Sequence, residues 1–204
     1  VYKRQWGWQQ ESLAHRHIGY PHGGHSIYGL ALRLEGSAFP GSIRYAAQRY
    51  SGGEWVEGAD GARILDVGCA GGFPSVPLAI LFPGAHFTAA DSIRKKITVV
   101  EGVAASLGLE NLTPRCVRVE TLKERFDYVV SRAVTAMPEF VKWVWPLIER
   151  GERGSLPNGI LYLKGGDLAE ELALTGKRWY IYDIPRFFEE DFFETKKVVY
   201  TPKK

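Results

Sequence analysis

The sequence predicts an α/β protein built on a doubly wound, mostly parallel sheet of seven strands with an antiparallel edge strand. The first observation is that short apolar runs alternate with amphipathic stretches from Gly61 onward, as in consecutive βα units. The second is that the last two apolar runs have no helix-length segment between them. Because parallel strands need a long crossover, these two strands are expected to form an antiparallel pair at one edge.

Seven strands and three helices are expected in this part of the chain. The apolar runs predict strands at Arg63–Val67, Ala85–Ala90, Thr113–Val119, Phe126–Ser131, Gly159–Leu163, Trp179–Ile184 and Lys197–Thr201. The amphipathic stretches predict helices at Pro77–Leu81, Ser92–Leu107 and Pro138–Ile148. Ser92 is the expected N-cap of the second helix. This order of elements resembles the sheet of class I (Rossmann-like) methyltransferases.

The composition is that of a globular protein, with 45% hydrophobic and 24% charged residues among 204. No apolar run approaches the roughly 20 residues that cross a bilayer, and the start of the chain lacks the order of a signal peptide. Two cysteines are too few for a disulfide framework. We therefore expect a cytoplasmic monomer without a membrane partner. The net charge of +3 permits an anionic partner but does not require one.

Residues 1–60 are expected to form an N-terminal segment distinct from a domain at residues 61–204. The segment has poor helical or strand periodicity and many glycines and prolines, which predicts little regular structure. It holds four of the five histidines, namely His15, His17, His22 and His25. Their spacing includes no helical pair four residues apart and no cysteine partner, so we expect no metal site.

The most informative stretch is 64–74, where an apolar strand runs into small residues and then into a helix. Small residues let a ligand approach the backbone, and the first turn of the helix presents unpaired N–H groups. Asp91 follows Gly68 by 23 residues, at the end of the second strand. A carboxylate at that place commonly accepts the hydroxyls of a nucleoside ribose. The alternative is that the stretch is only a tight turn between strand and helix.

Two nucleoside cofactors fit such a loop. A dinucleotide fingerprint has glycine where Ala70 and Phe73 stand here, so an NAD(P)-dependent oxidoreductase fits poorly. S-adenosylmethionine has no phosphate, and Asp66 beside the loop can hold its cationic amino group, whereas this acid would repel a pyrophosphate. The residues favour S-adenosylmethionine. The oxidoreductase and an inactive cofactor-binding fragment stay open as alternatives.

The segment Gly71–Ile80 is more specific than a glycine loop. It resembles the family of glucose-inhibited division protein B, methyltransferases that modify a guanine N7 in small-subunit (16S) ribosomal RNA. Three further stretches carry the resemblance, which covers about residues 62–204: Asp91–Lys96, Phe126–Ala133 and Leu163–Gly166. Ala70 and Ser75 stand where the family usually has glycine. A methyl group at Ala70 is strained if that residue needs a positive φ.

The resemblance implies S-adenosylmethionine as cofactor and small-subunit ribosomal RNA, or its assembling particle, as partner. By matched position it implies a cofactor site at Gly68, Phe73, Asp91, Val119, Glu120 and Arg132, to which the loop adds Asp66. It implies Arg132 and Lys164 as groups that position the base or a phosphate. Guanine N7 carries a lone pair and no proton, so no general base is expected. For Arg132 the alternative is a surface ion pair with an acid such as Glu139.

Overall fold

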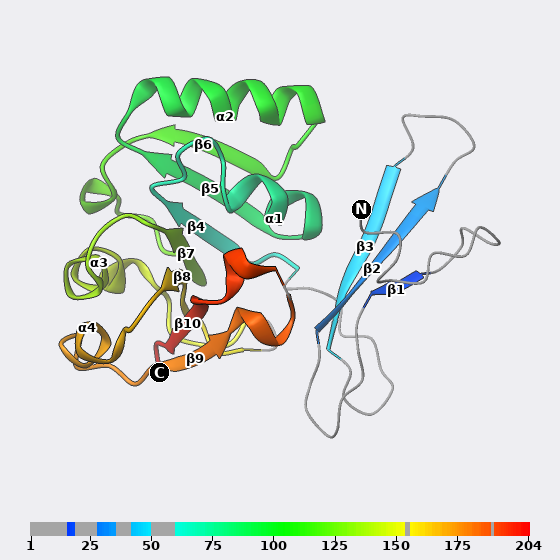
Figure 1. Cartoon of the computed structure of the whole chain (residues 1–204). Coiled ribbons are helices and arrows are strands. Elements are labelled where there is room, and N and C mark those ends of the chain that lie inside the picture. The colour runs from blue at the N-terminus through cyan, green and yellow to red at the C-terminus, as the bar shows by residue number, and fades with distance from the viewer. Residues whose placement is uncertain (1–15, 19–27, 36–41, 50–59, 154–155, 189) are drawn as a thin grey trace. The chain divides into compact units, whose positions relative to one another are not determined.

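The computed structural model describes residues 16–18, 28–35, 42–49, 60–153, 156–188 and 190–204. The chain divides into two compact units, Val1–Gly58 and Ala59–Lys204, which are drawn in Figure 1. Each unit is described by itself below. Among the described residues, no helix has both the length and the apolar character that a bilayer crossing requires.

The first unit contains a three-stranded antiparallel sheet. Its strands are β1 (Arg16–Ile18), β2 (Tyr28–Glu35) and β3 (Ser42–Arg49), in the order β1-β2-β3. The expectation of little regular structure in this segment is wrong for these strands. Leucines at positions 30, 32 and 34 of β2 have the period-two spacing of a strand, which was the available signal. His15, His22 and His25 lie outside the described residues.

The second unit is built on a seven-stranded sheet in the order β6-β5-β4-β7-β8-β10-β9. Its strands are β4 (Arg63–Val67), β5 (His86–Asp91), β6 (Leu112–Cys116), β7 (Tyr128–Arg132), β8 (Gly159–Gly165), β9 (Tyr180–Asp183) and β10 (Lys196–Pro202). Strands β4 to β8 pair in parallel, and β10 runs antiparallel to both β8 and β9. The predicted fold class is confirmed, including an edge strand, β9, that is antiparallel to its neighbour. The structure adds that β10 is inserted between β8 and β9.

Four helices cover the two faces of this sheet. They are α1 (Ser75–Leu81), α2 (Arg94–Leu107), α3 (Met137–Val144) and α4 (Ala169–Ala173), and four short 3-10 turns are η1 (Val119–Thr121), η2 (Trp145–Leu147), η3 (Ile184–Arg186) and η4 (Asp191–Phe193). The predicted helix at 138–148 is α-helical only as far as Val144. It continues as the 3-10 turn η2 because Pro146 has no N–H for a further α-helical hydrogen bond. The prediction of Ser92 as an N-cap is wrong. The backbone N–H of Ile93 is bound instead by the Asp91 side chain, at 2.9 Å.

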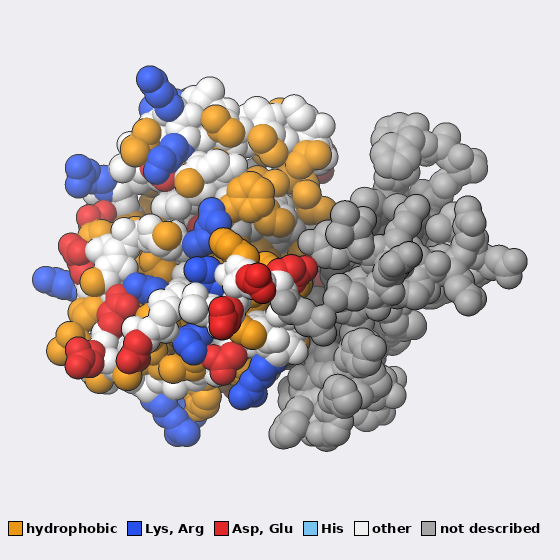
Figure 2. Space-filling model, viewed as in Figure 1, with side chains coloured by type: hydrophobic (Ala, Val, Ile, Leu, Met, Phe, Trp, Pro, Cys, Tyr) orange, Lys and Arg blue, Asp and Glu red, His pale blue; other side chains and the backbone are white. Residues whose placement is uncertain are grey.

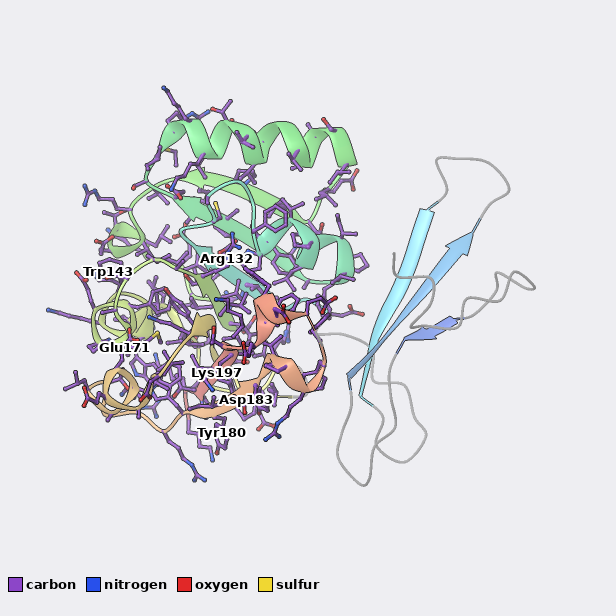
Figure 3. All side chains as sticks on the ribbon, viewed as in Figure 1. Arg132, Trp143, Glu171, Tyr180, Asp183 and Lys197 are labelled. Atoms are coloured by element: carbon purple, nitrogen blue, oxygen red, sulfur yellow. The ribbon has the colours of Figure 1, made fainter. Side chains whose placement is uncertain are left out.

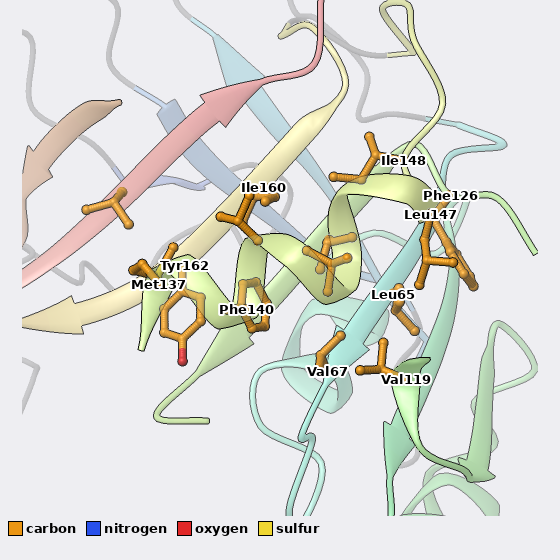
Figure 4. Close-up of a cluster of buried hydrophobic side chains, with 14 of the residues drawn as sticks. Leu65, Val67, Val119, Phe126, Met137, Phe140, Leu147, Ile148, Ile160 and Tyr162 are labelled. Atoms are coloured by element: carbon orange, nitrogen blue, oxygen red, sulfur yellow. The ribbon is translucent and has the colours of Figure 1, made fainter. Parts of the chain in front are cut away.

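The core consists of two clusters, one on each face of the sheet. Helices α1 and α2 pack on one face, against Phe87 and Tyr128 among others. Helices α3 and α4 pack on the other face, where Phe140 meets Tyr162 edge to face at a centroid distance of 4.7 Å. Figure 4 shows this second cluster under α3. The carboxyl ends of the parallel strands therefore meet at one edge of a sheet that is held from both sides, and ligands of open α/β sheets bind at that edge.

Candidate active site

The loop between β4 and α1 can be formed only with glycine at two positions. Gly68 has φ +68°, and a Cβ on it would collide with the Val134 side chain. Gly72 has φ +100°, and its Cβ would stand 2.5 Å from Cγ2 of Val76. The backbone N–H of Gly68 donates to the carbonyl oxygen of Ala90 on β5, at 2.8 Å. The loop is therefore closed tightly over the ends of β4 and β5, and its N–H groups are largely engaged within the protein.

Ala70 adopts the left-handed conformation that its position demands, with φ +48°. The strain anticipated for a methyl group here is thus present, at a cost on the order of 1 kcal/mol. The Ala70 N–H donates to Oδ2 of Asp91 at 3.2 Å, a contact that helps to hold the residue in this conformation. The alanine that stands here in place of the family's usual glycine leaves the loop in place, because it removes no polar contact.

Asp91 lies at the end of β5 and joins the loop to α2. Its side chain is buried, and its Oδ2 accepts from the Ala70 N–H and lies 3.4 Å from Nζ of Lys96. Its Oδ1 accepts from the Ile93 N–H. Each carboxylate oxygen has more than one lone-pair site, so these contacts fix the orientation of the group while leaving capacity for ligand hydroxyls.

Asp66 is fully buried at the end of β4, and one of its oxygens is incompletely satisfied. Oδ2 accepts from the Ser75 N–H at 3.0 Å, whereas Oδ1 and the Ser75 hydroxyl have no hydrogen-bond partner in the described part of the chain. Burial raises the pKa of Asp66 to about 6, against the opposing effects of Ser75 and of the Arg132 charge. An orphaned, buried carboxylate oxygen fits a bound ammonium group such as that of S-adenosylmethionine.

Arg132 ends β7 at the same edge. In the register of the sheet Asp66 lies opposite Val130, so Arg132, two residues further on, projects from the same face as Asp66. The Arg132 side chain is exposed, and Figure 3 labels it near the centre of this unit. No ion pair joins Arg132 to Glu139 among the described residues, and the Glu139 carboxylate accepts from the Thr135 hydroxyl at 2.8 Å. Asp66, Asp91 and Arg132 thus belong to one electrostatic site.

The other predicted site residues differ in their exposure and in the face of the sheet on which they lie. Phe73 is 56% exposed beside the glycine loop, and Glu120 is exposed in η1. Val119 is buried in the core cluster under α3. Lys164 lies on the opposite face of the sheet from Arg132, and its Nζ donates to Glu171 at 2.7 Å and to the Thr135 carbonyl oxygen at 3.3 Å. Its ammonium is therefore engaged within the protein.

Two neighbours of the site were missed from the sequence. Ser75 supplies the N–H that binds Asp66, and its place directly after the glycine loop was the signal. Val134 packs against Gly68 from the loop that follows β7. No local pattern predicts this contact, because only the pairing of β4 with β7 brings the two residues together.

Solved structures share the fold of this chain. The fibrillarin/Nop5p complex matches with a TM-score of 0.54 at 11% identity, over 72% of this chain and 74% of that chain. The precorrin-6y C5,15-methyltransferase of Geobacter metallireducens matches with a TM-score of 0.53 at 14% identity, over 71% and 81%. At these identities the likeness concerns the fold alone. Together with the glycine loop and its acids, it defines a class I methyltransferase.

The family follows from sequence relatives. The family model for rRNA small subunit methyltransferase G (GidB) matches residues 51–192. The ribosomal RNA small subunit methyltransferase G of Flavobacterium johnsoniae is 52% identical over 148 residues, 71% of this chain and 68% of that protein. Its counterpart in Flavobacterium psychrophilum is 54% identical over 144 residues, with the same shares of 71% and 68%. The chain belongs to this family, which confirms the resemblance carried by the segment Gly71–Ile80.

Proposed function

We propose that this protein transfers a methyl group from S-adenosylmethionine to N7 of a guanine in small-subunit (16S) ribosomal RNA, with residues 61–204 as the catalytic domain. The observation that carries the proposal is the meeting of Asp66, Asp91 and Arg132 at the carboxyl edge of a methyltransferase sheet, in a chain of this family. The failed dinucleotide fingerprint and the buried acid at Asp66 disfavour an NAD(P)-dependent oxidoreductase.

The residues of this edge divide the work of binding. Asp66 would hold the ammonium group of S-adenosylmethionine with its orphaned oxygen, and Asp91 would hold the ribose hydroxyls. The backbone at Gly68 and the side chains of Phe73, Val119 and Glu120 would line the remainder of the cofactor. When bound, S-adenosylmethionine supplies an electrophilic methyl group on a sulfonium sulfur.

Catalysis in this site is positioning. Guanine N7 has an in-plane lone pair and no proton, so no side chain has to act as a general base. The protein aligns the base with the methyl group and excludes water, which together are worth several kcal/mol of the barrier. Arg132 is the group that we assign to the target base or an adjacent phosphate, since its guanidinium is exposed at the edge where the cofactor would end.

The substrate has to present N7 in an accessible form. The major groove of an A-form helix is deep and narrow, so we propose that the target guanine lies in a splayed loop or is reached in an assembling particle. Figure 2 shows Lys and Arg side chains near the centre of the visible face of residues 60–204, beside apolar side chains and several Asp and Glu side chains. We propose that the Lys and Arg side chains meet RNA phosphates. We also propose that the protein works as a cytoplasmic monomer.

Two measurements test the proposal. Calorimetry should detect binding of S-adenosylmethionine and none of NAD. Transfer of a labelled methyl group to small-subunit RNA should follow, with the label at guanine N7. Cofactor binding without transfer, to either naked RNA or an immature particle, supports the inactive-fragment alternative. Binding of NAD alone supports the oxidoreductase.

Replacing Asp91 with alanine is expected to weaken binding of S-adenosylmethionine by about 1.5–3 kcal/mol, the cost of losing hydrogen bonds to a charged group. Calorimetry measures the change. The matched control is Lys96→Ala, which removes a half-exposed partner of the carboxylate and leaves the carboxylate itself. It should cost less than about 1 kcal/mol. Unchanged affinity in Asp91→Ala would remove Asp91 from the site.

A further inference from the structure

The loop between β7 and α3, residues 133–136, directly follows Arg132 and reaches the glycine loop through Val134. Ala133 has φ +53°, a conformation that an L residue adopts only when its surroundings hold it. Val134, the next residue, packs its side chain against Gly68. The conformation of these two residues therefore places Val134 against the glycine loop, two residues after Arg132.

Three polar contacts from neighbouring elements hold this loop. The Val134 N–H donates to the hydroxyl of Tyr162 at 2.8 Å, and Nζ of Lys164 donates to the Thr135 carbonyl oxygen at 3.3 Å. The Met137 N–H, at the start of α3, donates to Oε1 of Glu171 at 2.7 Å. Tyr162 and Lys164 come from β8, whereas Glu171 comes from α4, 34 residues beyond Met137.

Glu171 replaces the missing N-cap of α3. The N-cap residue of that helix is Ala136, whose methyl side chain cannot accept a hydrogen bond from the free N–H groups of the first turn. The Glu171 carboxylate binds one of them and places a negative charge at the positive end of the helix. The same oxygen accepts from Lys164 at 2.7 Å. Although burial acts against it, these contacts lower the pKa of Glu171, so the carboxylate is ionised at neutral pH.

We infer that Glu171 is a positioning residue for methyl transfer. From α4, together with Lys164, it holds the β7–α3 loop and, through Val134, the glycine loop in the arrangement that receives the cofactor. Figure 3 labels Glu171 apart from Arg132, and the Glu171 carboxylate already accepts from Met137 and Lys164, so we assign it no direct contact with the cofactor or the target base. The inference rests on the proposed function, and it gives Lys164 an indirect role in place of a direct contact with the substrate.

The test compares four variants of the full chain. Glu171→Ala removes both contacts, while Glu171→Gln keeps an acceptor for the Met137 N–H and loses the ion pair. Lys164→Met removes the ion pair from the other side. Glu170→Ala, the matched control, removes an adjacent exposed acid on α4. Calorimetry with S-adenosylmethionine and single-turnover methyl transfer at saturating cofactor are measured for each variant, below its melting temperature.

Glu171→Ala is expected to weaken cofactor affinity about fivefold and to slow single-turnover transfer about tenfold, as displacement of a positioning element does. Glu171→Gln should recover most of both losses, and Glu170→Ala should match the unmodified protein. A fifth, double variant combines Lys164→Met with Glu171→Ala. The effects of these two changes should not add in it, because both act on one linked set of contacts.

Two results would overturn the inference. One is a folded Glu171→Ala variant with unchanged affinity and rate. The other is a Lys164→Met variant that loses RNA affinity alone, with an effect that adds to that of Glu171→Ala, because Lys164 would then contact the RNA directly. An unmodified protein that neither binds S-adenosylmethionine nor methylates RNA would instead refute the proposed function.

Discussion

Replacing Arg132 with alanine is expected to abolish most methyl transfer while leaving the fold intact. The Arg132 side chain is exposed at the end of β7, whose other residues are buried, so its loss removes little packing. Its charge acts on Asp66, which places it at the cofactor edge of the sheet. Loss of a group that positions the base should lower the rate by one to several orders of magnitude. The measurement is single-turnover transfer at saturating S-adenosylmethionine, alongside a thermal melt.

Two further variants sharpen this prediction. Arg132→Lys should recover little activity, because a guanidinium makes planar, forked contacts that an ammonium cannot make. Arg178→Ala is the matched control, since Arg178 is also exposed but lies just before β9, the outermost strand of the sheet. It should keep full activity. An active Arg132→Ala variant would refute the assignment, and a large fall in its melting temperature would favour a structural role.

Replacing Asp66 with asparagine is expected to stabilise the protein and at the same time to weaken its binding of S-adenosylmethionine. Burial raises the pKa of Asp66 from 3.8 to about 6, so the folded protein holds this proton more tightly than the unfolded chain does. Stability is therefore lost as pH rises through that interval, by up to about 3 kcal/mol. Asparagine carries no charge and still accepts from the Ser75 N–H, so the melting temperature should rise at pH 7.5.

The same substitution removes the partner of the cofactor's ammonium group. Cofactor affinity should fall about 10- to 100-fold, the range for a lost hydrogen bond between charged groups. In the unmodified protein, affinity should fall as pH drops below about 6, because Asp66 becomes protonated. That dependence should vanish in Asp66→Asn. Melting curves and calorimetry between about pH 5 and about pH 8 measure both effects.

The matched control is Asp127→Asn, which changes a buried acid ahead of β7. Asp127 is satisfied, because its Oδ2 accepts from the Arg63 N–H at 2.8 Å and lies 3.6 Å from Nε of the same arginine. Its substitution should lower the melting temperature and leave cofactor affinity unchanged. If Asp66→Asn behaved in the same way, Asp66 would be a structural acid and not a ligand for the cofactor.

The parts of this protein that depend on local pattern can be predicted from its sequence. Apolar runs of strand length, the glycines of the loop after β4 and the acid that ends β5 are readable because period, turn chemistry and strand ends are properties of short segments. The convergence of Asp66, Asp91 and Arg132 also follows from the sequence, since parallel strands bring their carboxyl ends to one edge.

The way in which those residues are supported cannot be predicted from local pattern. The insertion of β10 between β8 and β9, the contact of Val134 with Gly68 and the capping of α3 by Glu171 join segments far apart in the chain. Such contacts leave no periodic trace, because each depends on where a whole strand or helix is placed. The ammonium of Lys164 illustrates the consequence: packing of α4 supplies Glu171 as its partner, a contact that the stretch Leu163–Gly166 does not predict.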